Sequence, residues 1–224
     1  MKYQCLVLDH DDTVVDSTAS IHYPAFLEAL KIMRPGETLS LEDYFRENFS
    51  PGFIEFCTQR YQMTQQDLDV EVEIWRNYVK NHIPKAYHGI KELIERQKAE
   101  GGYICVVSHS YDFNIRRDYK ANNLPEPDLI FGWEYPAHQR KPSPYALEVI
   151  CNKFDLEPSQ LLMVDDLKPG YDMAKAFGVP FAGAGWANEI PEIRSFMQEN
   201  SDFYFTRVEE LFQFLFEKHI YLNP

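Results

Sequence analysis

The order of its apolar and amphipathic segments is the feature that most constrains how this chain can fold. Short apolar runs alternate with helix-length amphipathic segments, first at "YQCLVL" (3–8) and then repeatedly from about residue 87. Such alternation predicts βαβ units, and runs that are apolar almost throughout predict parallel strands covered on both faces. We therefore expect an α/β fold with a Rossmann-like, mainly parallel sheet. The later strands are expected at "YICVVS" (103–108), "LIFG" (129–132), "LLMV" (161–164), "VPFAGAG" (179–185) and "FYFT", and the intervening helices at 89–100, 111–123, 143–154, 169–178, 189–200 and 207–219.

A long helical block interrupts this pattern after the first strand. Residues 18–86 carry almost no strand signal, and they predict helices at about 20–34, 41–48, 51–61 and 65–81, with breaks at "RPG" and "SPG". A block of this length is too long for a simple connection, so we expect an inserted helical module. The expected organisation is a core formed by residues 1–17 and 87–224, a helical insertion at 18–86, and a hinge near Pro84.

Composition narrows the classes of partner. The formal net charge of −13 disfavours nucleic acid and anionic membrane surfaces, whose binders carry basic patches. The four cysteines are far apart and form no CxxC pair, which predicts neither a zinc site nor a disulfide framework. There is no signal-peptide pattern and no long apolar run. We expect a cytoplasmic protein, monomeric or a small homo-oligomer, that acts on a small molecule.

The segment "LDHDDTVVDS" directly after the first strand crowds four carboxylates, those of Asp9, Asp11, Asp12 and Asp16, into eight positions. Like charges this close raise one another's pKa. Such a segment is stable as a solvated turn or when a cation holds the charges together. Taken alone, a D-x-D pattern fits the solvated turn.

Polar residues follow the other strands as well. Ser108 ends the second strand, Asp165 and Asp166 follow the fourth, and Lys141 in "RKPSP" precedes a helix. Ligands of open parallel sheets bind at the carboxyl ends of the strands. The sequence therefore predicts that the acids, a hydroxyl and a lysine meet at one edge of the sheet.

This set of groups suits phosphoryl transfer. Carboxylates near one point favour Mg²⁺, and a carboxylate held rigidly at a strand end, such as Asp9, can act as a nucleophile through an aspartyl-phosphate. Asp11 can serve as the general acid and base, and its backbone carbonyl can bind the metal. Ser108, with the N–H of His109, can donate to phosphoryl oxygens, and Lys141 supplies positive charge.

Each of these residues also has a simpler interpretation. Ser108 alone fits a strand-end cap, and Lys141 alone fits a surface lysine before a helix. Asp165 and Asp166 alone fit acids at a helix N-terminus, where the macrodipole favours them. The functional interpretation depends on their order, spacing and shared location.

In this order, the segments resemble the motifs of the haloacid dehalogenase-like hydrolase superfamily. "LDHDDTVVDS" resembles the D-x-D-G-T/V box, "YICVVS" the second motif and "KPSP" the third. "LLMVDDLKPGYDMAKAFGV" resembles the fourth motif, and the resemblance covers residues 3–17 and about 88–185. The residues that fall on motif positions are Asp9, Asp11, Thr13, Ser108, Lys141, Asp165, Asp166, Gly170 and Gly178.

The resemblance implies a Rossmann-like core, dependence on Mg²⁺ and phosphoryl chemistry, with Asp9, Asp11, Asp165 and Asp166 at the metal. The helical insertion resembles the type 1 cap of phosphoglycolate phosphatase-like and β-phosphoglucomutase-like members. Dehalogenases of the superfamily lack the acid at position 11, so its presence favours phosphate esters. We expect a phosphomonoester hydrolase that acts on a small phosphorylated metabolite.

Two features depart from the motifs. Asp12 replaces the usual glycine of the first box, and its role stays open; pointing into solvent is one interpretation. His109 stands where Asn is common. Asp16 is expected to cap the structure that follows and to have no chemical role.

The helical insertion offers several candidates for residues that select the substrate. Candidates are His22, Arg46 and Asn48, together with Arg60 and Arg76, and each of them also fits a surface position on an amphipathic helix. "VEVEIWRNYV" at helical spacing predicts cap core rather than pocket. His22 lies out of register with the hinge histidine of mutase-like members, which favours a phosphatase. A phosphomutase and a catalytically idle binding module remain alternatives.

Overall fold

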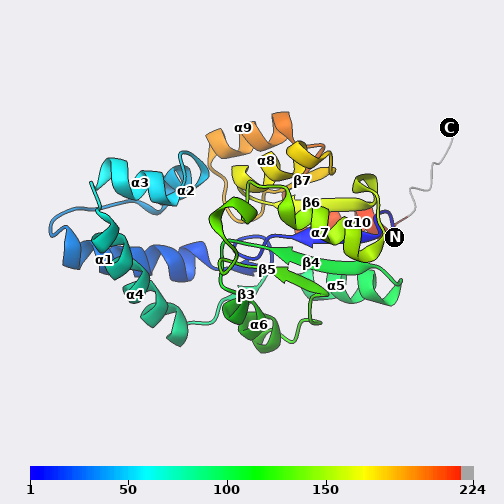
Figure 1. Ribbon diagram of the computed structural model, residues 1–224, viewed down its shortest axis with the longest axis horizontal. Helices are drawn as coiled ribbons and strands as arrows, with labels where there is room; N and C mark the ends of the chain where they lie inside the picture. Colours follow the sequence, from blue (N-terminus) through cyan, green and yellow to red (C-terminus); the bar gives the residue numbers. More distant parts are fainter. Residues whose placement is uncertain (218–224) are drawn as a thin grey trace.

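The computed structural model describes residues 1–217. Six strands form one sheet in the order β5-β4-β1-β6-β7-β8, and every neighbouring pair is parallel (Figure 1). The expected α/β fold with a parallel sheet is therefore confirmed. The strands are β1 (Cys5–Leu8), β4 (Tyr103–Val107), β5 (Leu129–Phe131), β6 (Leu161–Asp165), β7 (Phe181–Ala184) and β8 (Phe203–Phe205).

Helices cover both faces of this sheet, which explains why its strands are apolar throughout. Leu6 and Leu8 of β1 join a core cluster with residues of α5 (Ile90–Ala99), α6 (Asp112–Ala121) and α10 (Val208–Phe216). Cys5 and Val7 point to the opposite face, because side chains alternate along a strand. That face packs against α7 (Tyr145–Phe154), α8 (Lys168–Phe177) and α9 (Pro191–Asn200).

Residues 18–81, here called the helical module, lie beyond the carboxyl ends of the strands (Figure 1). They have an aromatic core of their own, in which Phe26 packs against Tyr44, Phe56 and Tyr61. Ser40 and Thr64 cap two of the helices through their side-chain oxygens. The module consists of the π-helical turn η1 (Thr18–His22), α1 (Tyr23–Met33), α2 (Leu41–Phe49), α3 (Phe53–Arg60) and α4 (Gln65–Asn81).

Two linkers join the module to the sheet, and they pair with each other. β2 (Val15–Asp16) and β3 (Lys85–Ala86) form a two-stranded antiparallel ladder. The sequence did not predict this ladder, because two residues are too few to show a strand period.

The module also touches the core on two sides of the strand ends. On one side, the Phe49 and Phe196 rings meet edge to face with centroids 5.3 Å apart. On the other, Trp75 of α4 lies over Tyr111, with centroids 5.9 Å apart. These contacts enclose the edge of the sheet where the predicted site residues lie.

Two further observations bear on the sequence expectations. Cys5, Cys57, Cys105 and Cys151 are all buried free thiols. Within residues 1–217, no helix combines the length and the apolar character that a membrane span requires. The end of the last predicted helix, residues 218–219, and the rest of the predicted core up to 224 lie outside the described residues.

Candidate active site

The acidic turn, residues 9–13, begins where β1 ends. The Asp9 N–H donates to the Val164 carbonyl at 2.9 Å and so continues the ladder between β1 and β6 by one residue. The turn then closes on itself, because the His10 carbonyl accepts from Val14 N at 2.9 Å. Asp9 is therefore held as rigidly as a strand residue.

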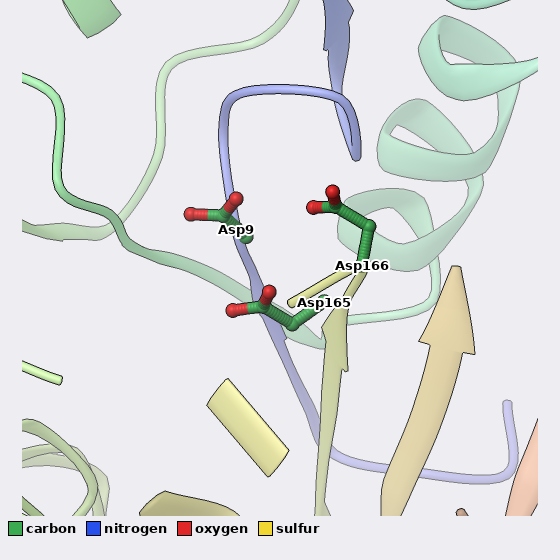
Figure 2. Close-up of side chains that lie close together, drawn as sticks. All are labelled: Asp9, Asp165 and Asp166. Carbon is green, nitrogen blue, oxygen red and sulfur yellow. The ribbon is translucent and has the colours of Figure 1, made fainter. Parts of the chain in front are cut away.

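Three carboxylates meet at the carboxyl ends of β1 and β6. One oxygen from each of Asp9, Asp165 and Asp166 lies within 4.8 Å of the others, and all three side chains are buried (Figure 2). Lys141 Nζ donates to Asp9 Oδ1 at 2.8 Å and to Asp165 Oδ2 at 2.7 Å. The structure thus brings together four residues that the sequence placed at one sheet edge.

Helix α8 fixes the Asp165 side chain of this cluster. The Leu167 N–H donates to Asp165 Oδ1 at 2.8 Å, so both Asp165 oxygens are occupied by protein groups. A Cβ at Gly170 would stand 2.1 Å from Asp165 Oδ2, so only glycine lets α8 approach this closely.

The cluster carries an excess of negative charge. Burial, together with repulsion from Asp9, raises the pKa of Asp165 to about 7, although the attraction of Lys141 opposes this. Burial and the neighbouring carboxylates Asp12, Asp165 and Asp9 raise the pKa of Asp166 as well. One ammonium against three carboxylates leaves two negative charges in excess, which a divalent cation would neutralise.

The donor set fits Mg²⁺. Asp9 keeps Oδ2 free of protein hydrogen bonds, and Asp166 receives only a hydrogen bond from the Thr13 hydroxyl, at 3.3 Å, within residues 1–217. Both offer hard carboxylate oxygens, the ligands that Mg²⁺ prefers. Asp9 and Asp166 would hold the ion, and Asp165 is committed to orienting Lys141.

Asp11 lies in a different environment, at the boundary with the helical module. Its Oδ1 accepts from Ser17 Oγ at 2.8 Å and from His22 Nε2 at 2.9 Å, and its Oδ2 accepts from Ser110 Oγ. Burial opposes ionisation, but attraction to His22 and hydrogen bonds from His22 and Ser110 outweigh it, so the pKa of Asp11 lies below its usual value. His22 thus contacts Asp11, although in the sequence it lies out of register with the hinge histidine of mutase-like members.

Trp75 sets the tautomer of His22. The indole Nε1–H of Trp75 points at His22 Nδ1 over 2.9 Å. An indole N–H can only donate, so Nδ1 accepts and Nε2 carries the proton that is donated to Asp11. A helix of the module, α4, therefore orients a side chain that binds the acidic turn.

The two residues after β4 present donors to the same edge of the sheet. Ser108 is buried, and its hydroxyl oxygen accepts from Ser110 N at 3.1 Å. The His109 ring donates through Nε2 to the Lys141 carbonyl at 3.1 Å. Within residues 1–217, the backbone N–H of His109 has no hydrogen-bond acceptor, so it is free to bind a ligand.

Asp12 acts as a cap and does not point into solvent. It is buried, with φ at 59°, the left-handed region that the usual glycine would adopt. Its Oδ1 accepts from Ser17 N at 3.2 Å and from Thr18 N at 3.1 Å, at the start of η1. Burial raises the pKa of Asp12 to about 6.

The prediction that Asp16 caps the following structure is wrong. Asp16 is exposed on β2, opposite Lys85, and among the described residues its carboxylate accepts no hydrogen bond. The chain must turn immediately after β1 to enter the module, so the orphan N–H groups of η1 point back at residue 12.

The remaining cap candidates bind protein groups. The Arg46 guanidinium contacts Glu42 and Asp43 on its own helix and Glu192 of α9 at 3.5 Å. The Asn48 amide donates to Tyr44 O at 2.7 Å. Arg60 pairs with Glu47, and Arg76 with Glu73 and the Tyr111 hydroxyl.

Sequence reasoning missed two residues of the site. Ser110 was passed over, although it lies two positions after Ser108, where the period of an extended chain returns a side chain to the same side. Trp75 was assigned to the cap core, because helical periodicity reports burial and not the direction of an indole N–H.

Comparison with known proteins agrees with this arrangement. Residues 6–184 match the family model described as "Haloacid dehalogenase-like hydrolase". A phosphoglycolate phosphatase of Aquifex aeolicus (strain VF5) is 25% identical over 199 residues, which cover 84% of this chain and 89% of that protein. One from Haemophilus influenzae (strain 86-028NP) is 28% identical over 138 residues, 60% of this chain and 59% of that protein's length.

The fold has solved counterparts as well. The crystal structure of a predicted phosphoglycolate phosphatase from Haemophilus somnus 129pt superposes with a TM-score of 0.76 at 19% identity, covering 96% of this chain and 98% of that one. With the family model spanning both the acidic turn and the Asp165–Asp166 pair, the chain belongs to the haloacid dehalogenase-like hydrolases.

Proposed function

We propose that this hydrolase is a Mg²⁺-dependent phosphatase that cleaves a small phosphate monoester through a phosphorylated Asp9. The observation that carries the proposal is the setting of Asp9. It is buried at a strand end, its Oδ1 is bound to Lys141, and one of its oxygens lies within 4.8 Å of an oxygen of Asp166. The phosphoglycolate phosphatase relatives support phosphate-ester chemistry.

Asp9 would attack the phosphorus atom with one of its carboxylate oxygens, and the bond between phosphorus and the oxygen of the leaving alcohol would break. When bound by Asp9 and Asp166, Mg²⁺ would supply positive charge that neutralises the phosphoryl oxygens. Lys141, Ser108 and the N–H of His109 would stabilise the same oxygens as negative charge develops on them. Water would then cleave the aspartyl-phosphate and regenerate Asp9.

Asp11 would protonate the leaving oxygen in the first step and take a proton from water in the second. Its lowered pKa keeps the carboxylate ionised, as the second role requires, but also makes it a weaker base. The first role requires a protonated carboxyl, so the contacts of Asp11 with His22 and Ser110 have to change when the substrate binds.

We also propose that the helical module is the cap that covers the substrate and excludes water. Its contacts at Trp75 and Phe49 on two sides of the strand ends support this role. The four buried free thiols support a reducing, cytoplasmic setting.

The test is hydrolysis of p-nitrophenyl phosphate with Mg²⁺ or with EDTA. We expect Mg²⁺-dependent phosphate release that Asp9→Asn reduces by more than about a thousandfold, because the amide is a poor nucleophile. The exposed Asp16→Asn is the matched control and should retain activity.

The outcomes separate the alternatives. Conversion of a sugar 1-phosphate to its 6-phosphate without release of phosphate would point to a mutase. A wild-type protein without turnover, and without a beryllofluoride-induced rise in Tm, would be an idle binding module.

A further inference from the structure

A chain of buried polar side chains leads away from the acidic turn toward α6. His10 lies between Asp9 and Asp11, and its ring is fully buried. Its Nε2 lies 3.1 Å from Asp118 Oδ2, and Asp118 is itself buried on α6. Since a carboxylate accepts, His10 donates this hydrogen bond, and the ring holds the backbone that joins the two acids.

The chain continues from Asp118 to the helical module. Arg117 Nε donates to Asp118 Oδ1 at 2.8 Å, and its Nη1 donates to the Val79 carbonyl at 2.8 Å. Val79 lies in the last turn of α4, and its carbonyl also accepts from the N–H of the C-cap residue His82 at 3.2 Å. One arginine therefore joins the end of the module to the residue that binds His10.

The C-cap residue of α6, Asn122, also holds the second linker, which contains β3. Asn122 Nδ2 donates to the Pro84 carbonyl at 3.0 Å, and Asn122 Oδ1 accepts from Ala86 N at 2.8 Å. Arg117 and Asn122 together fix the path of the chain as it leaves α4. The first linker is bound directly by the acidic turn, through Asp12.

Packing alone does not account for these residues. Within residues 1–217, His10 Nδ1 is buried without a partner, which carries a desolvation cost. An apolar side chain would fill the position next to Tyr119 without that cost, and buried ion pairs add little net stability over apolar packing. These polar contacts cost stability, but they connect the acidic turn to the end of the helical module.

We propose that Asp118 and Arg117 are positioning residues that act through His10 to hold the catalytic acids in the geometry set by the docked helical module. This inference rests on the proposed phosphatase function. It assigns the module a second role besides covering the substrate: when α4 is docked, Arg117 is held, and the acidic turn is aligned.

The test compares two neighbouring arginines of α6. Arg117→Met keeps the aliphatic stem but removes the donors. Arg116→Met is its matched control, because Arg116 is exposed and its ion pairs among the described residues are those with Asp112 and Glu126. With p-nitrophenyl phosphate, we expect Arg117→Met to lower kcat about tenfold and to change KM less than about threefold. Arg116→Met should leave both values within about twofold.

A double-mutant cycle between His10→Asn and Arg117→Met tests transmission. Within residues 1–217 the two side chains are linked by hydrogen bonds only through Asp118. If they act as one unit, the double variant should lose little more kcat than the more impaired single variant. If Arg117→Met does not fold, Arg117→Lys replaces it, because lysine keeps one donor that can bind Val79 O. The kcat of Arg117→Lys should then lie below that of wild type.

The outcomes are distinct. A lowered Tm with kcat unchanged well below Tm, or fully additive losses in the cycle, would overturn the positioning role and leave the phosphatase proposal intact. As a readout besides turnover, the beryllofluoride-induced rise in Tm should be smaller in Arg117→Met than in wild type, and an equal rise counts against the inference. A wild type without turnover and without that rise would refute the phosphatase function and this inference together.

Discussion

The two halves of the candidate site are built in different ways. The core half, which comprises Asp9, Lys141, Asp165 and Asp166, is formed by strand ends and by loops of the sheet domain. The boundary half, which comprises Asp11, Ser110, His22 and Trp75, is formed across the junction between the sheet and the helical module. The two halves meet within three residues, at Asp9 and Asp11.

Different contacts fix the side-chain positions in the two halves. The core half depends on the ladder between β1 and β6 and on a buried ion network, and among the contacts described above the module reaches it through Arg117, Asp118 and His10. In the boundary half, the orientation of His22 toward Asp11 depends on α4, which presents Trp75 to His22. In the proposed mechanism, the core half binds the phosphoryl group and the boundary half transfers the proton. The two roles therefore depend on different sets of contacts.

The largest expected effect breaks the core half. Lys141→Met leaves Asp9 and Asp165 buried without their cation, so in EDTA the free energy of unfolding should fall by about 3 to 5 kcal/mol. Urea denaturation measures this loss. Lys168→Met, which removes an exposed pair with Asp172, is the control and should change stability by less than about 1 kcal/mol. Equal losses in the two variants would mean that the core half does not depend on Lys141.

A smaller effect concerns charge on the module side. Glu71 is buried on α4, one turn before Trp75, and within residues 1–217 it has no hydrogen bond or ion pair. Burial raises the pKa of Glu71 from 4.5 to about 7. The folded state thus favours the protonated carboxyl, and the stability that this contributes is full below about pH 4.5 and lost as the pH rises through about 7.

Glu71→Gln removes this titration. We expect the variant to exceed wild type in unfolding free energy by about 2 kcal/mol at pH 8.5 and by little at pH 5. Glu73→Gln, an exposed neighbour on the same helix, should show no such pH dependence. A difference that is constant between the two pH values would contradict the assignment to Glu71.

The smallest expected effect concerns the hydrogen bond from Trp75 to His22, which belongs to the boundary half alone. Trp75→Phe keeps an aromatic ring but removes the donor to His22 Nδ1, so the His22 ring is no longer held against Asp11. We expect kcat to fall about tenfold, while the beryllofluoride-induced rise in Tm stays as in wild type, because the core half is untouched. Tyr78→Phe removes a hydroxyl from the same helix and is the control. If Trp75→Phe also reduced the rise in Tm, the two halves would not be separable.

The sequence predicted the core half better than the boundary half for a physical reason. Asp9, Ser108 and Asp165 each end an apolar run, and parallel strands bring their carboxyl ends to one edge whatever the surrounding loops do. Lys141 does not end a strand, so it was placed by its position in a loop just before a helix and by its resemblance to a motif. The helix periods likewise predicted the module, including α4 at residues 65–81.

The boundary half depends on directions that sequence patterns do not carry. Periodicity predicted that Trp75 belongs to the cap core but could not show that its N–H faces His22. The capping role of Asp12 depends on where η1 begins relative to β1, and the sequence suggested an outward-pointing side chain instead. The ladder between β2 and β3 pairs residues that lie about seventy positions apart, which a local pattern does not reveal.

That ladder bears on how the chain can change over evolution. Val15 faces Ala86 and Asp16 faces Lys85, so the polypeptide enters and leaves the insertion at one point on the surface. A segment whose ends are already adjacent can be lengthened, shortened or exchanged for an unrelated one without displacing the strands beneath it. The sheet can therefore keep the site proposed at its edge while the insertion at this point changes.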